Sequence, residues 1–248
     1  MVVVTTKQGI ISTNNDQLII QADAQNQTYG QLLINPNVTF NTQPHATIEL
    51  TSISYKTSAT DYLYERFALP TGFAVDSVKG DALTYFERFN TSNNQWEGIG
   101  YLNYPAGGEL QIDKLNEPFT QFHLFTYNPG EKYKFYGKLQ GNKDVNLTIK
   151  GHSWVGLGNS YAANVSVTEV LAALKEVFQG DAKNLALYYY ECVNPGLKKY
   201  QWTAVTESTV DNKAQLRPME VFLIKNDGGE MELPIDYNSM IWEPVVGE

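Results

Sequence analysis

Short strand-type segments, each closed by turn residues, recur along almost the whole of this 248-residue chain. The segment "ATIELTSISY" at 46–55 alternates apolar and polar residues with period two, which is typical of a half-buried strand. Turn signals such as "TSNNQ", "PAGGE", "NPGE" and "QGNKD" separate later segments of the same kind. This density of short strands predicts a mostly β protein built from sandwich or jelly-roll-like units.

One segment, 166–180, has instead the periodicity of an amphipathic helix. Ser166 and Glu169 form a capping box at its start, and Gly180 can adopt the left-handed conformation that ends a helix. The apolar residues at helical spacing are Val167, Val170, Leu171, Leu174, Val177 and Phe178. We therefore expect this helix to pack one face on a sheet.

The strand-type segments form two similar series, separated by roughly 90–105 residues. Each series has an aromatic strand with a corner, then a strand and polar turn that lead to a tryptophan, and then an aromatic strand with a tight turn. The tryptophan is Trp96 in the first series and Trp202 in the second. We predict two related β modules at 56–150 and 151–248, behind an N-terminal β segment at 1–55 that docks on another surface or stacks as rungs.

Composition excludes several classes of function. With 27 acidic and 18 basic residues the formal net charge is −9, which argues against a nucleic-acid groove and against a preference for anionic membranes. No apolar run is long enough for membrane insertion. The single cysteine, Cys192, allows neither an intrachain disulfide nor a cysteine-based zinc site. The start, "MVVVTTKQGIIS", has no basic n-region, so we expect no signal peptide.

The stretch "GHSWVGLGNSYAANVS" at 151–166 resembles a reactive loop only superficially. Gly156 and Gly158 are followed by neither the lysine nor the further glycine that a phosphate loop needs. A nucleophile elbow at Ser160 would need a histidine downstream, and the last histidine is His152. We expect instead a structural corner, with the tryptophan buried in it, formed by Trp154, Gly156, Gly158, Asn159 and Tyr161.

No other cluster predicts chemistry. The histidines are scattered, although His123 alternates with apolar neighbours and so falls on a sheet face. Cys192 lies in an apolar strand, where thiols are usually inert. A glycosidase-like carboxylate pair stays open among Glu65, Glu87, Glu97 and Glu191. Calcium stays open in the loops at 14–17 and 142–146. The expectation is a protein that is not an enzyme and needs no cofactor.

Three stretches carry a resemblance to a known family. "SWVGLGNSYAANVS", "LYYYECVNPGLKKYQWTAV" and "LRPMEVFLIKND" together resemble a β module common in extracellular proteins of Bacteroidetes. Its "W-x-L-x-G-N-P-Y-P" corner is matched by Trp154, Gly158, Asn159 and Tyr161. Ser160 and Ala162 replace the two prolines, and Met219 replaces the glycine of a later Pro-Gly. The resemblance implies a non-enzymatic, surface-displayed or secreted protein tied to adhesion or export.

The expected lack of a signal peptide suggests that a second kind of protein, made in the cytoplasm, has the same β architecture. A structural protein of a phage that infects Bacteroidetes, such as a head fibre or capsid decoration protein of the crAss-like kind, is released by lysis. For such a protein we expect a virion surface location and a homo-oligomer, with a trimer favoured. Residues 1–55 would then dock on other virion proteins. The alternative location is extracellular or on the surface of a bacterial cell.

Aromatic residues on the strands predict a contact surface. The run "LYYYE" places Tyr188 and Tyr190 on one face of a strand and Tyr189 on the other. The predicted contact residues are Tyr62, Tyr64, Tyr188, Tyr190, Trp96 and Trp202. Two hypotheses follow: a structural component of an assembly, and a module that binds glycan or protein. If 1–50 folds back on its own module beside an open aromatic surface, the binding hypothesis gains.

Overall fold

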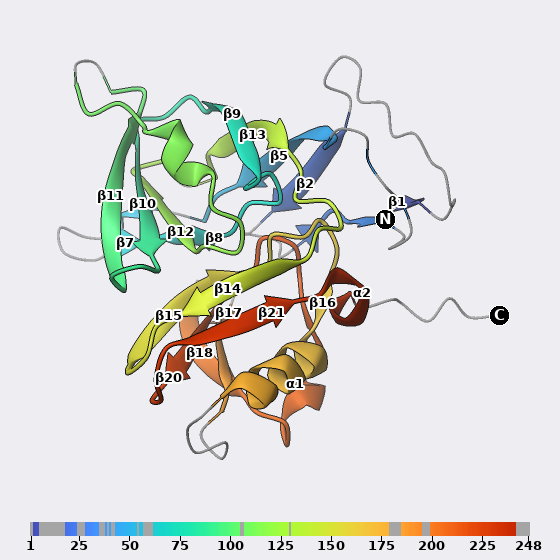
Figure 1. Ribbon diagram of the computed structural model, residues 1–248. Coiled ribbons are helices and arrows are strands. Elements are labelled where there is room, and N and C mark those ends of the chain that lie inside the picture. The colour runs from blue at the N-terminus through green and yellow to red at the C-terminus, as the bar shows by residue number, and fades with distance from the viewer. Residues whose placement is uncertain are drawn as a thin grey trace.

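The computed structural model describes residues 2–4, 18–23, 28–34, 38, 40, 43–53, 55–56, 62–104, 107–128, 130–178, 185–194 and 199–241 of the chain. Over these residues the protein is mostly β, with several antiparallel sheets and short helices, as the sequence predicts (Figure 1). None of the helices within the described ranges is long and apolar enough to span a membrane.

Two sheets pack together in the part drawn blue to green in Figure 1. One is antiparallel and has the order β11 (Gln95–Leu102), β10 (Thr84–Asn90), β12 (Phe122–Thr126) and β8 (Glu65–Phe67). The other has the order β3 (Thr28–Tyr29), β2 (Ile19–Asp23), β5 (His45–Thr51), β13 (Lys132–Lys138) and β9 (Ala74–Lys79). Phe67 and Phe86 of the first sheet contact Phe135 of the second, with ring centroids 5.4 and 6.3 Å apart. The two sheets therefore share a core.

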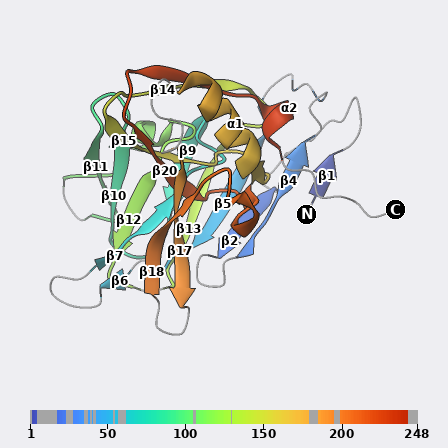
Figure 2. The same ribbon diagram turned by 90° about the horizontal axis from the view of Figure 1, so that it is seen from below.

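A second unit is drawn yellow to red in Figure 1. Its main sheet is antiparallel, in the order β15 (Ser153–Gly158), β20 (Val221–Asn226), β17 (Leu187–Asn194) and β18 (Lys199–Val205). A two-stranded sheet joins β14 (Val145–Ile149) to β21 (Met231–Ile235), and α1 (Val167–Val177) packs on β21. Seen from below, α1 and α2 (Tyr237–Met240) lie beside β14, away from β17 and β18 (Figure 2).

Short elements complete the described structure. The paired ones are β1 (Val2–Val4) with β4 (Leu32–Ile34), β6 (Tyr55–Lys56) with β7 (Tyr62–Leu63), and β16 (Val165–Ser166) with β19 (Gln215–Leu216). Two 3₁₀ turns are η1 (Ile112–Leu115) and η4 (Val210–Asn212). The strand order β8-β12-β10-β11 in the first unit matches β15-β20-β17-β18 in the second, position for position along the chain. This shared order is the structural counterpart of the two series in the sequence.

The helix begins where its cap predicts. The Ser166 hydroxyl accepts a hydrogen bond from the Glu169 backbone N–H at 3.3 Å, which satisfies one of the free donors of the first turn. The buried face consists of Val167, Val170, Leu171 and Leu174. The last helical residue is Val177, and the expected stop at Gly180 lies outside the described residues.

Strand pairing crosses both of the predicted boundaries. Strand β5, in the expected N-terminal segment, pairs along its whole length with β13, and β2 runs parallel to β5. Strand β14, before the boundary at 150, pairs with β21 near the end of the described chain. The division into 1–55, 56–150 and 151–248 stays a prediction about domains, but neither boundary separates one sheet from another.

Candidate functional site

The stretch after β15 forms a corner held by the side chain of Asn159. Its amide nitrogen donates to the backbone oxygens of Ala163, Leu216 and Arg217, at 2.9, 3.1 and 3.1 Å. Its Oδ1 accepts from the Tyr161 N–H at 2.9 Å. A buried amide that satisfies this many backbone groups fixes the path of three segments at once. Asn159 therefore has a structural role.

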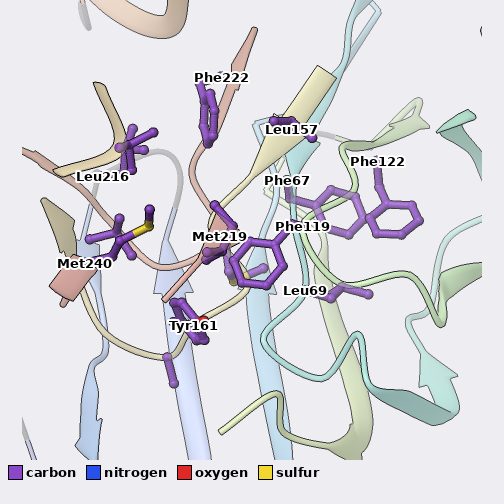
Figure 3. Packing of buried hydrophobic residues seen from close by; sticks show 14 of the residues in the cluster. Phe67, Leu69, Phe119, Phe122, Leu157, Tyr161, Leu216, Met219, Phe222 and Met240 are labelled. Carbon is purple, nitrogen blue, oxygen red and sulfur yellow. The ribbon is translucent and has the colours of Figure 1, made fainter. Parts of the chain in front are cut away.

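The corner also joins the two units. The Gly158 N–H donates to the Phe119 carbonyl at 2.9 Å, and the Ala68 N–H donates to the Met219 carbonyl at 3.0 Å. Phe119 and Met219 each follow a proline and have positive φ, 62° and 66°. Figure 3 draws their side chains in the buried cluster at this junction. Both residues therefore have a left-handed backbone, a conformation that glycine adopts most readily.

The remaining corner residues divide between core and surface. The Tyr161 ring is fully buried, and its hydroxyl donates to the Lys143 carbonyl at 2.8 Å. Gly156 faces Phe89 of the first unit, whose ring leaves little room for a side chain there. The expectation that Trp154 is buried is wrong, because 45% of it is exposed. Side chains alternate along β15, so Trp154 falls on the outer face, where its ring meets Tyr188 edge-on at 4.9 Å.

Two exposed tryptophans are linked across the units by polar side chains. Trp96 on β11 stacks on His123 of β12, with ring centroids 3.6 Å apart. The cross-strand neighbour of His123 on β8 is Arg66. The Arg66 guanidinium lies 4.1 Å from the Tyr190 ring centroid and 5.7 Å from that of Trp202. We call these five residues the aromatic strip.

The strip is accessible at its two ends. Trp96 is 39% exposed and Trp202 is 37% exposed, whereas His123 between them is only 8% exposed. Tyr64 borders the strip, with its ring centroid 5.4 Å from that of His123. Tryptophan is enriched at surfaces that bind ligands or partners, because its ring is apolar and its N–H is polar. The strip is therefore the candidate site.

The centre of the strip is polar. Glu87, His123 and Arg66 are neighbours across β10, β12 and β8. His123 Nδ1 lies 3.6 Å from Glu87 Oε2, and His123 Nε2 has no hydrogen-bond partner among the described residues. Burial lowers the pKa of His123 to about 4, with a further decrease from the Arg66 cation, although the hydrogen bond and charge of Glu87 oppose both effects. His123 is therefore neutral at pH 7.

Several predicted contact residues lie at or near this strip. Tyr188 and Tyr190 are half-buried and Tyr189 is buried, which confirms the predicted alternation along the strand. The side chain of Tyr62 lies outside the described residues. Sequence reasoning missed Arg66 as a site residue. Its position two residues after Tyr64, on the same face of the strand, was the available signal.

The other candidate groups are engaged elsewhere. The Glu65 carboxylate accepts from the Ile53 N–H at 2.8 Å, and the Glu97 carboxylate pairs with Arg88 at 2.9 Å. Asp144, in the loop at 142–146, accepts from the Tyr237 N–H at 2.8 Å. The described ranges contain no group of three or more His, Cys, Asp or Glu residues that could hold a metal ion. The side chains of Cys192 and Glu191 and the loop at 14–17 lie outside these ranges.

Comparisons with known proteins give no relative. No protein-family model and no curated protein matches the chain. Two solved structures match with 10% identity: PNGase F, a glycosylasparaginase from Flavobacterium meningosepticum, and a peptide-N(4)-(N-acetyl-β-D-glucosaminyl) asparagine amidase. The first match covers 77% of this chain and 99% of the other at a TM-score of 0.24, and the second covers 76% and 99% at 0.22. At TM-scores this low, the likeness supports no conclusion about function.

Proposed function

We propose that this chain is a non-enzymatic recognition protein that binds glycans along the aromatic strip. The observation that carries the proposal is the series of neighbours that runs from Trp96 through His123 and Arg66 to Trp202. The two open rings come from different units, so the strip can contact a ligand longer than one sugar.

The chemistry of the strip suits a sugar. A pyranose ring has an apolar C–H face that stacks on an indole and a rim of hydroxyls that donate and accept hydrogen bonds. Glu87 offers an acceptor and Arg66 offers donors, while the buried His123 holds the Trp96 ring beside them. A purely apolar protein surface would not need this mixture of groups beside the rings.

The N-terminal strands favour binding over assembly. The two hypotheses differ in what residues 1–50 contact, and β2 and β5 complete a sheet with β13 of the same chain. These two strands are therefore part of a sheet of their own chain. Together with the exposure of Trp96 and Trp202, this pairing supports the recognition hypothesis.

The proposal is tested by glycan-array binding followed by calorimetry on the best ligand. Trp96→Ala and Trp202→Ala should each weaken binding by about tenfold or more, because contacts through large aromatic residues dominate such surfaces. Phe73→Ala is the matched control, since this exposed ring lies on Lys143 and outside the strip. Equal affinities for all three variants and the unsubstituted protein would refute the role of the strip.

The second candidate is a structural component of a virion surface. The resemblance to surface-displayed modules supports it. In that case a second copy of the chain, and not a glycan, covers Trp96 and Trp202. Light scattering at several concentrations separates the two, because a stable trimer that Trp202→Ala dissociates would support assembly.

A further inference from the structure

Arg66 differs from the other arginines in its partners, and this difference leads to an inference about ligand specificity that rests on the proposed glycan binding. The chain has three arginines. Arg88 pairs with Glu97 and Glu117, and Arg217 pairs with Glu220 at 3.5 Å. Arg66 makes no ion pair with a carboxylate among the residues that the structure describes; its guanidinium lies against the Tyr190 and Trp202 rings instead.

Among the side chains that the structure describes, none supplies a carboxylate to compensate the positive charge of Arg66. Its Nε is buried and has no hydrogen-bond acceptor within the described part of the chain. The adjacent residue across the sheet is His123, and Glu87 follows only after it in the row. The imidazole of His123 stands between the Arg66 guanidinium and the Glu87 carboxylate in this row, so the two do not form a direct ion pair. A guanidinium without a carboxylate partner can bind an external anion through its two terminal nitrogens.

We propose that the strip selects glycans that carry a carboxylate, such as those with uronic or sialic acid residues, and that Arg66 binds this group. The planar guanidinium matches a carboxylate with two parallel hydrogen bonds, which a hydroxyl cannot reproduce. The sugar rings on either side of the acid then stack on Trp96 and Trp202. Arg66 thus sets the specificity, and the two tryptophans supply contact area to both acidic and neutral ligands.

The net charge of the chain implies that any preference for an acid depends on the contact with Arg66. At −9 the protein repels an anionic ligand at a distance, so long-range attraction contributes nothing to affinity. Selectivity for an acid must therefore come from the local contact. Removal of the Arg66 charge should abolish the preference rather than weaken it slightly.

The test uses three oligosaccharides, containing galacturonic acid, glucuronic acid or N-acetylneuraminic acid, each as the free acid and as its methyl ester. The ester keeps every ring, removes the charge and adds one methyl group. Calorimetry should show that at least one acid binds about tenfold or more tightly than its ester, which corresponds to about 1.4 kcal/mol. Arg66→Gln should reduce this ratio to about one, and Arg66→Lys should give an intermediate ratio.

Controls keep the outcomes distinct. Lys79→Gln removes a cation from an exposed position on β9 and should leave the ratio unchanged, and thermal unfolding checks that each variant is folded. Acid and ester bound equally by the unsubstituted protein, or an acid preference that survives in folded Arg66→Gln, would overturn the role of Arg66 while glycan binding stands. Binding of none of the six ligands would overturn the acid preference, and the glycan array then decides separately whether the strip binds glycans at all.

Discussion

Ala68 and Gly158 meet where the two units join, so closely that a Cβ on Gly158 would lie 2.5 Å from the Cβ of Ala68. Each residue follows or ends the corresponding strand of its own unit, β8 or β15. Each also donates its N–H to the other unit, Ala68 to Met219 and Gly158 to Phe119. The same contact is therefore made twice with the roles of the units exchanged, and one of the two positions has to be glycine.

This contact predicts the cost of a single methyl group. Gly158→Ala should lower the free energy of unfolding by about 1–3 kcal/mol, because the packed junction cannot take the added atom without a shift of the backbone. Ala68→Gly in the same chain should restore part of the loss. Gly229→Ala is the control, since a Cβ there would meet nothing within 4 Å. Chemical denaturation measures all four proteins, and equal effects at positions 158 and 229 would contradict the close approach.

The positive φ of Met219 predicts that a glycine variant is more stable than an alanine variant, which is the reverse of the usual order. At a φ of 66°, the backbone of an alanine is strained by about 1–2 kcal/mol, whereas that of a glycine is not. Met219→Gly should therefore be more stable than Met219→Ala, although both lose the buried side chain. Met240 is the control, because it is equally buried but helical, and there the alanine variant should be the more stable. Thermal or urea unfolding of the four variants gives the two differences.

The Asn159 amide predicts a sharp difference between nearly isosteric residues. Asn159→Asp removes the donors to the Ala163, Leu216 and Arg217 carbonyls and places a carboxylate oxygen against them. The expected loss of stability is about 2–3 kcal/mol at neutral pH. Asn93→Asp should change little, because the exposed Asn93 side chain only accepts a hydrogen bond, from the Gln95 N–H. A stable Asn159→Asp protein would show that the corner does not depend on this amide.

His123 predicts a loss of stability in mild acid. Its pKa is about 4 in the folded protein and 6.5 as the ordinary value, so between these two values the unfolded chain binds a proton that the folded protein does not. Acidification through this window therefore favours unfolding, by at most on the order of 3 kcal/mol below pH 4. Unfolding measured from pH 7 to pH 4 should show the decline, and NMR titration should place the His123 midpoint near 4.

A substitution separates the contribution of His123 to this pH dependence from that of other groups. His123→Gln should flatten the pH dependence across the same window, whatever it does to stability at pH 7. His152→Asn is the matched control, because His152 is exposed and has a positive φ of 52°, which asparagine tolerates. A decline with the same slope in His123→Gln would assign the effect to other groups.

Local patterns predicted several features of the fold correctly. The alternation of 46–55 gave a strand whose buried residues include Ile48 and Leu50, because a side-chain period of two depends only on backbone geometry. The capping residue Ser166 located the start of α1 for a similar reason, since the cap bonds within the same turn. The failure at Trp154 has the opposite cause. Large aromatic residues are usually covered, and only the arrangement of the second unit leaves this one on the outer face.

The sequence by itself determined the mostly β class, the one long helix and the order of two similar series, because turn residues, caps and hydrophobic periods act over a few neighbours. The tertiary structure alone decided that Gly158 faces Ala68 and that Arg66 connects Trp202 to His123 and Trp96. These pairs are far apart along the chain, and no local pattern encodes which strands meet. The candidate site consists of such long-range contacts, so it follows from how the two units pack.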